Sequence, residues 1–203
     1  MSSTRTTVRT HWVAVRAMLI FTAVLGVAYT LVITGIGQLV LPAQANGSML
    51  RDGSGTVVGS SLIGQSFTDA EGAPLPEWFQ PRPSAAGDGY DGGASSGSNY
   101  GPENADLIAA IGERRAQVAA FEGVAPDEVP VDALTASASG LDPHISPEYA
   151  RLQVARVAAA RGLPEAEVAE LVESRIQARD LGYLGDPTVN VLELNLALAA
   201  LGE

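Results

Sequence analysis

Residues 17–41, AMLIFTAVLGVAYTLVITGIGQLVL, decide the fold, because this stretch contains no charged residue. A helix rises about 1.5 Å per residue, so the stretch reaches roughly 37 Å. The hydrocarbon core of a bilayer is roughly 30 Å thick, which a helix of this length crosses with some tilt. The sequence therefore predicts one transmembrane helix over residues 17–41, preceded by residues 1–16 and followed by residues 42–203.

The residues before the apolar stretch set its expected orientation. Arg5, Arg9 and Arg16 are the charged residues of segment 1–41, and no acid accompanies them. Arginines beside a span stay in the cytoplasm by the positive-inside rule. We therefore expect a single-pass protein with residues 1–16 in the cytoplasm and residues 42–203 on the extracytoplasmic side.

A cleaved signal peptide is the alternative to an anchor, since Ala43-Gln44-Ala45 matches an A-x-A cleavage pattern. The apolar region of a signal peptide is usually about 7–15 residues long, and this one is longer. A buried core helix is a weaker alternative, because the stretch has no polar face. Length therefore favours an uncleaved membrane anchor.

Small and weakly polar residues recur along the predicted span. Every fourth position carries one of them, namely Thr22, Gly26, Thr30 and Thr34. Residues four apart share one side of a helix, and small side chains let helices pack closely in lipid. The stripe is a candidate helix-packing face, although Gly and Thr are also common in such helices generally.

The composition excludes several classes of function. The chain has 203 residues and a net charge of −11, with neither cysteine nor lysine. Residues 42–203 carry nine arginines against all 23 acids, a charge of −14. Nucleic acid is excluded as a partner, because phosphate binding needs clustered basic side chains. A P-loop ATPase is excluded because it needs its phosphate-binding lysine.

The segment after the span predicts a mixed α/β (α+β) domain. Turn signals at Asn46-Gly47 and Asp52-Gly53 separate short apolar pieces that indicate a hairpin. Residues 72–102 are rich in Gly, Ser and Pro and are either a functional loop or poorly ordered. Apolar spacing and capping residues predict helices and one strand in the remainder: a helix ending before Gly123, a helix from Ser146 to Arg161, a helix from Pro164 to about Arg179, a short strand at 188–190, and a helix over 191–201.

One motif raises the possibility of hydrolysis. Gly93 to Gly97 reads G-x-S-x-G, in which Ser95 takes the nucleophile position. That elbow needs a buried strand before it and a helix after it, and here it lies within a Gly/Ser-rich loop. His144 is the single histidine on the same side of the predicted membrane. A secreted or anchored hydrolase is therefore a disfavoured alternative.

Six short segments spread over nearly the whole chain form a recognisable set. They are Gln44–Ser48, Gly59–Gln65 followed by Phe67, Arg82–Ala85, Ala94–Asn99, Val129–Ser146 and Val189–Leu198. In their sequence and their order these segments resemble one known family, the C subunits of the Kdp potassium-transporting ATPase (KdpC). The Pro-rich insert 73–78 and the long basic leader are departures from the pattern.

The resemblance implies a role in a bacterial inner-membrane complex that takes up potassium. Its expected partners are the channel-like A subunit (KdpA), the ATPase B subunit (KdpB) and the small F subunit (KdpF). The complex uses ATP, Mg and K⁺, and the C subunit supports assembly and has been proposed to raise the ATP affinity of the ATPase subunit. The phosphorylation motif Asp-Lys-Thr-Gly is absent here, so we expect a non-catalytic subunit that itself binds no cofactor.

Two further expectations follow. Because ATP is cytoplasmic and residues 42–203 are predicted to lie outside, an effect on ATP affinity would act through the membrane helix or through assembly. Loops on a rigid scaffold commonly carry binding, which makes Ser95, Ser98 and Asn99 candidate interface residues. A membrane-anchored extracytoplasmic solute-binding module is the alternative function.

Overall fold

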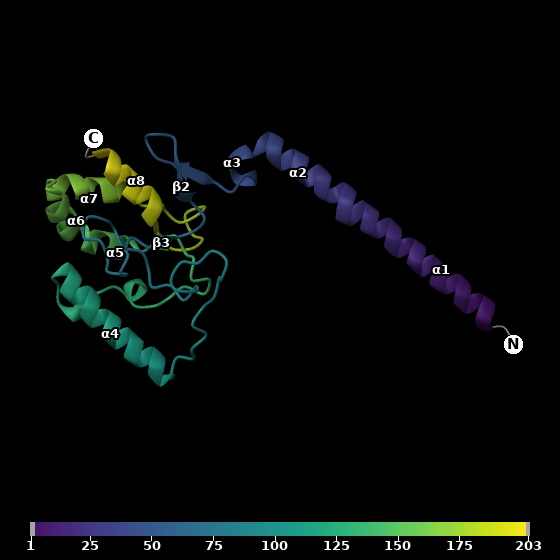
Figure 1. Cartoon of the computed structure of the whole chain (residues 1–203), viewed down its shortest axis with the longest axis horizontal. Helices are drawn as coiled ribbons and strands as arrows, with labels where there is room; N and C mark the ends of the chain where they lie inside the picture. The colour runs from purple at the N-terminus through teal and green to yellow at the C-terminus, as the bar shows by residue number, and fades with distance from the viewer. Residues whose placement is uncertain (1–2, 202–203) are drawn as a thin grey trace. The chain divides into compact units, whose positions relative to one another are not determined.

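The computed structural model describes residues 3–201 and divides into two compact units, Met1–Ser48 and Met49–Glu203 (Figure 1). The first is helical, and the second combines helices with two small sheets. The predicted fold class, one apolar helix followed by a mixed α and β domain, is confirmed.

A long helix makes up most of the first unit. It is built from α1 (Ser3–Phe21), a π-helical segment η1 (Thr22–Ala28) and α2 (Tyr29–Val40). Residues Thr6–Val40 are long and apolar enough to cross a membrane, and their most apolar 18-residue window has a mean hydropathy of 2.2. The helix begins well before the charge-free stretch, because no glycine or proline interrupts the chain before Gly26.

The π-helical segment was not expected from the sequence. It covers Thr22 and Gly26, two members of the small-residue stripe. Further along, the Thr30 hydroxyl donates to the carbonyls of Gly26 and Val27, both at 2.9 Å. The apolar helix ends as predicted, since Pro42 cannot continue it and instead begins the short helix α3 (Pro42–Ala45).

Two short antiparallel sheets belong to the second unit. The predicted hairpin is confirmed by β1 (Met49–Arg51) and β2 (Val57–Ser60), which pair Met49 with Ser60. The second sheet joins β3 (His144–Ile145) to β4 (Val189–Asn190), strands that lie far apart in the sequence. The strand predicted at residues 188–190 is therefore present and has a distant partner.

Local signals place several helix ends correctly. Helix α4 (Ala105–Glu122) begins at the N-cap Asn104 and ends at Gly123, whose φ is 72°. Two 3₁₀ turns follow, η2 (Pro126–Glu128) and η3 (Val131–Ala133). Helix α8 (Val191–Leu201) begins with Asn190 accepting a hydrogen bond from the Glu193 amide at 3.1 Å.

Two predicted helices are shorter than expected. The helix predicted from Ser146 to Arg161 is divided at Gln153 into α5 (Pro147–Leu152) and α6 (Val154–Arg161). Helix α7 (Glu165–Ser174) ends before the predicted Arg179. Beyond it, Gln177 forms an antiparallel bridge with Thr188 through two backbone hydrogen bonds, and this pairing replaces the last helical turn.

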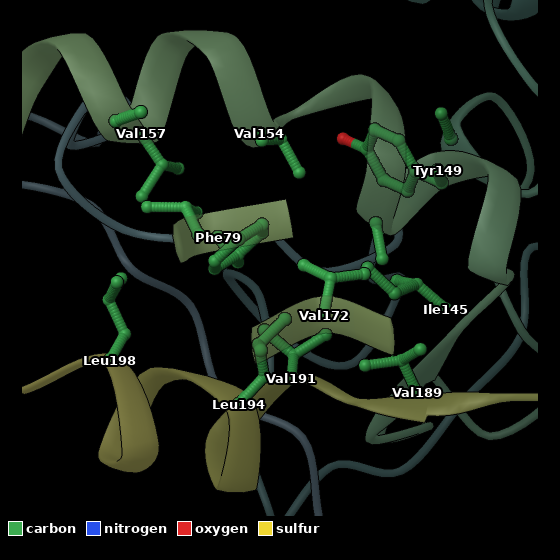
Figure 2. Packing of buried hydrophobic residues seen from close by; sticks show 14 of the residues in the cluster. Phe79, Ile145, Tyr149, Val154, Val157, Val172, Val189, Val191, Leu194 and Leu198 are labelled. Atoms are coloured by element: carbon green, nitrogen blue, oxygen red, sulfur yellow. The ribbon is translucent and has the colours of Figure 1, made fainter. Parts of the chain in front are cut away.

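The hydrophobic core of the second unit lies between α5, α6, α7 and α8. Figure 2 shows Phe79 from the long loop surrounded by Val157, Leu194 and Leu198 of the helices. All four side chains are fully buried. Fully burying one such side chain contributes about 1.5–3 kcal/mol. The loop 72–102 is therefore anchored in the core and is not merely a linker.

Candidate functional site

Segments that the sequence separates widely meet around the Ser84 hydroxyl. This group donates to the Gly140 carbonyl at 2.6 Å and accepts from the amides of Ala86 and Tyr90. One small side chain thus joins the Arg-Pro-Ser segment to the turn at residues 135–142. The bonds order the middle of the Gly/Ser-rich loop.

Gly140 occupies a position that other residues could not take without strain. Its φ is +67°, and a Cβ there would lie 2.7 Å from the backbone nitrogen of Ala86 and from the carbonyl oxygen of Ser96. The Ser96 amide donates to the Ser139 carbonyl at 3.0 Å beside it. Close backbone approach therefore requires glycine here.

The three candidate interface residues lie on this ordered loop and are exposed. The Ser95 hydroxyl donates to the Ser139 carbonyl at 2.9 Å, and the Asn99 amide donates to the Gly97 carbonyl at 3.1 Å. Ser98 lines a cavity of about 220 Å³. All three side chains belong to the same loop.

The G-x-S-x-G motif does not have the geometry of a nucleophile elbow in the described part of the chain. No strand leads directly into Gly93 and no helix begins directly after Gly97, because residues 61–104 contain neither element. The Ser95 proton is directed to a backbone carbonyl, whereas His144 lies beside Asp142, with 3.5 Å between Nδ1 and Oδ1. The motif arises from the small residues of the Gly/Ser-rich loop.

Sequence reasoning missed a charged cluster next to the loop. Arg82 pairs with Asp142 at 3.0 Å and donates to the Thr135 carbonyl at 3.2 Å. Burial acts to raise the pKa of Asp142, but hydrogen bonds from His144 and the charge of Arg82 outweigh it, so this pKa lies below its ordinary value. The residues belong to the quoted Arg82–Ala85 and Val129–Ser146 segments, but their pairing over 60 positions has no local signal.

Two buried amide side chains each bond both the backbone N–H and the backbone carbonyl of one loop residue, as a neighbouring β-strand would. Asn195 accepts from the Phe79 amide at 2.9 Å and donates to the Phe79 carbonyl at 3.0 Å. Gln153 does the same for Gln80, at 2.6 and 3.1 Å. These bonds satisfy backbone groups that the core would otherwise leave unpaired.

A buried ion pair fastens the Pro-rich start of the loop. Arg156 donates to Glu122 at 2.9 Å and to the carbonyls of Pro76 and Trp78. The two charged side chains are 8% and 1% exposed. Burial raises the pKa of Glu122 above its ordinary value, although the bond from Arg156 opposes this effect.

Fold and site together define a class of protein with one apolar N-terminal helix, a candidate membrane span, followed by an α+β domain that presents ordered loops. Among the residues from 3 to 201, no group of three His, Cys, Asp or Glu side chains is arranged to hold a metal ion. The exposed loop residues are small and polar.

The comparison with known proteins identifies the family. Residues 11–200 match the family model of the K⁺-transporting ATPase c chain, KdpC. The chain is 60% identical over 181 residues to the KdpC subunit of Kineococcus radiotolerans, covering 89% of this chain and 88% of that one. It is 53% identical to the KdpC subunit of Caulobacter vibrioides, covering 92% and 91%.

The chain therefore belongs to the KdpC family. It is a subunit of a bacterial potassium-transporting ATPase, a membrane-bound complex that uses ATP and K⁺. As a subunit of such a complex, it has partner subunits.

Proposed function

We propose that this chain is a non-catalytic accessory subunit that supports assembly of the channel-like KdpA and ATPase KdpB subunits, together with KdpF. The carrying observation is the apolar helix Thr6–Val40, whose most apolar window has none of its residues buried inside the chain. Such a surface is stable only when lipid or other helices cover it.

The proposed contact face on this helix is the stripe Thr22, Gly26, Thr30 and Thr34. A Cβ at Gly26 would meet only Thr22, 3.9 Å away on the same helix, so the notch at Gly26 is open. Thr30 already satisfies its hydroxyl within the helix, which leaves close packing rather than a polar bond as its contribution. The π-helical turn supports this assignment, because such turns occur frequently at functional sites.

We place the N-terminus in the cytoplasm and the second unit outside, on the bacterial inner membrane. ATP is then on the opposite side from Ser95, Ser98 and Asn99, which we propose as contacts to a partner subunit. An effect on the ATP affinity of the ATPase subunit would be transmitted through the helix or through assembly, as a coupling free energy between sites. The chain itself needs no cofactor for this role.

Purification of the tagged full chain from its native membrane in mild detergent tests the assembly role. We expect KdpA and KdpB to co-purify with the parent chain, and Gly26→Leu to reduce their recovery strongly. Gly35→Leu is the matched control, because nothing lies within 4 Å of a Cβ there and nine residues place it on the opposite helix side. Recovery of the chain alone, under conditions that preserve other complexes, would contradict the proposal.

Orientation can be measured independently, since the chain contains no cysteine. Two variants, Thr7→Cys and Ser98→Cys, each place a single cysteine in the chain. Intact cells that carry either variant are treated with a maleimide that cannot cross the membrane. We expect labelling at position 98 and protection at position 7 until the cells are opened. The reverse pattern would refute the proposed topology.

A further inference from the structure

A cavity of about 330 Å³ lies in the second unit, between α4 and the loop segment 80–90. Its wall includes two arginines, Arg82 and Arg114, together with Gln117 and Tyr149. No acidic residue lines it in the described part of the chain. This is unusual in a domain that carries 23 acids against nine arginines over residues 42–203.

The two arginines bond consecutive backbone carbonyls, and only one of them has a carboxylate partner within residues 3–201. Arg114 donates to the Leu134 carbonyl at 3.0 Å, and Arg82 donates to the next carbonyl, that of Thr135, at 3.2 Å. Arg82 has Asp142 as its counter-ion, whereas Arg114 forms no ion pair within residues 3–201. One positive charge at this wall therefore remains uncompensated.

Tyr149 adds a hydrogen-bond donor without a partner. The residue is 3% exposed and packs at the edge of the core (Figure 2), and it also lines the cavity. Its hydroxyl makes no hydrogen bond to any residue in the described range 3–201. Burial, followed by the charge of Glu122, raises the pKa of this phenol, so it stays protonated and able to donate.

Two other polar side chains of the wall are already engaged. The Tyr90 hydroxyl donates to the Arg82 carbonyl at 2.8 Å, and the Gln80 amide donates to the carbonyls of Phe67 and Leu75. These bonds hold the backbone that carries Arg82. The wall thus includes donors with spare capacity: the Arg114 guanidinium, which bonds only the Leu134 carbonyl within residues 3–201, the Tyr149 hydroxyl, and Arg82 Nε, which is buried without a hydrogen-bond partner.

We propose that this cavity binds an oxyanion, a phosphate or carboxylate group, held by the Arg114 guanidinium and the Tyr149 hydroxyl. Guanidinium groups match such anions because their planar N–H donors fit two oxygens at once. Arg82 contributes positive charge from its fixed place beside Asp142. The cavity volume suits a small ligand or a single charged side chain.

The test uses the full chain in detergent and inorganic phosphate as the probe, with sodium chloride holding the ionic strength constant. The side-chain Nε–H signals of the arginines are followed by NMR as phosphate is added. We expect a saturable shift of the Arg114 signal, and a similar response to acetate. No saturable shift with either anion would overturn the proposal.

Variants locate the binding. Removing a charged hydrogen bond costs about 1.5–3 kcal/mol, so Arg114→Gln should weaken phosphate binding, followed on the Arg82 signal, at least about tenfold. Tyr149→Phe keeps the ring in the core and should weaken it about two- to tenfold. Arg115→Gln on the same helix is exposed, does not line the cavity and should leave binding unchanged. Equal binding by Arg114→Gln and Arg115→Gln, in chains with parental unfolding midpoints, would contradict the site.

The oxyanion could be a free anion or a carboxylate of a partner subunit, and repeating the titration on the assembled complex distinguishes the two. This second experiment rests on the proposed assembly role. Phosphate binding that persists in the complex identifies a free anion as the ligand. Binding that is lost on assembly, and regained when the subunits are separated, identifies a carboxylate of a partner subunit that fills the cavity. Both results support an oxyanion site and separate its two sources.

Discussion

The substitution Arg156→Met is expected to destabilise the second unit by about 3–5 kcal/mol, because it leaves a buried carboxylate without its cation. The Glu122 side chain is 1% exposed, and its Oε1 has no hydrogen-bond partner. Its other oxygen receives the bond from Arg156 at 2.9 Å. Methionine keeps an apolar stem of similar length but loses the guanidinium that lies 4.5 Å from the Phe121 ring centre, so most of the loss comes from the missing charged group.

Chemical denaturation of the full chain in detergent measures this loss. Trp12 and Trp78 are the two tryptophans, and a Trp12→Phe background leaves Trp78 as the reporter. Trp78 lies under the Arg161 guanidinium, 4.2 Å from it, and its fluorescence therefore follows the packing of the second unit. Arg151→Met is the control, because its partner Glu173 is half exposed and such surface pairs contribute about 1 kcal/mol or less.

The double substitution Arg156→Met with Glu122→Leu should recover most of the stability, since an apolar pair avoids the unpaired charge. The single variant should also recover part of its loss in acid. A carboxyl whose folded pKa is raised favours the native state most below its ordinary value of 4.5, and this advantage disappears as pH rises through the raised value. The reasoning is refuted if Arg156→Met costs no more than Arg151→Met, or if the double variant is no more stable than the single one.

Three further predictions concern the loop and its supports. Asn195→Leu should lower the free energy of unfolding by about 2–4 kcal/mol, because the backbone amide and carbonyl of Phe79 lose their partners in the core. A decrease of less than about 1 kcal/mol would contradict the strand-like role of Asn195. Gly140→Ala should increase hydrogen exchange of the loop amides far more than Gly182→Ala, since both have positive φ but only Gly140 lacks space for a Cβ. Asp142→Asn should reduce the loss of stability that occurs in acid. The lowered pKa of Asp142 stabilises the folded protein above pH 3.8, its ordinary pKa, and this contribution is lost as pH falls through the lowered pKa. An unchanged loss of stability in acid would argue against the cluster.

Local chemistry was enough to predict the elements with strong signals at their ends. The apolar helix follows from a stretch without charge, and Pro42 ends it. Gly123 and Gly162 stop helices because both adopt a positive φ that glycine tolerates. Asn190 begins α8 through its side-chain cap. Each signal involves residues within a few positions of one another, which is why the sequence displays it.

The break at Gln153 and the early end of α7 were not predictable in this way. The spacing of apolar residues is consistent with one continuous helix from Ser146, and the break accompanies a buried side chain that binds Gln80, 73 residues earlier. The end of α7 follows from pairing of Gln177 with Thr188. In both cases a distant partner outweighed helix propensity.

The sequence by itself determined the class of this protein: one span, an acidic α+β domain, and a set of ordered segments typical of the KdpC family. Only the tertiary structure decided that the Gly/Ser-rich loop is anchored through Phe79, and that Arg82 meets Asp142. It also placed Arg114 and Tyr149 at one cavity. The physical reason is separation: periodicity and caps act over one helical turn, whereas these contacts join residues up to 116 positions apart and exist only once the core has closed.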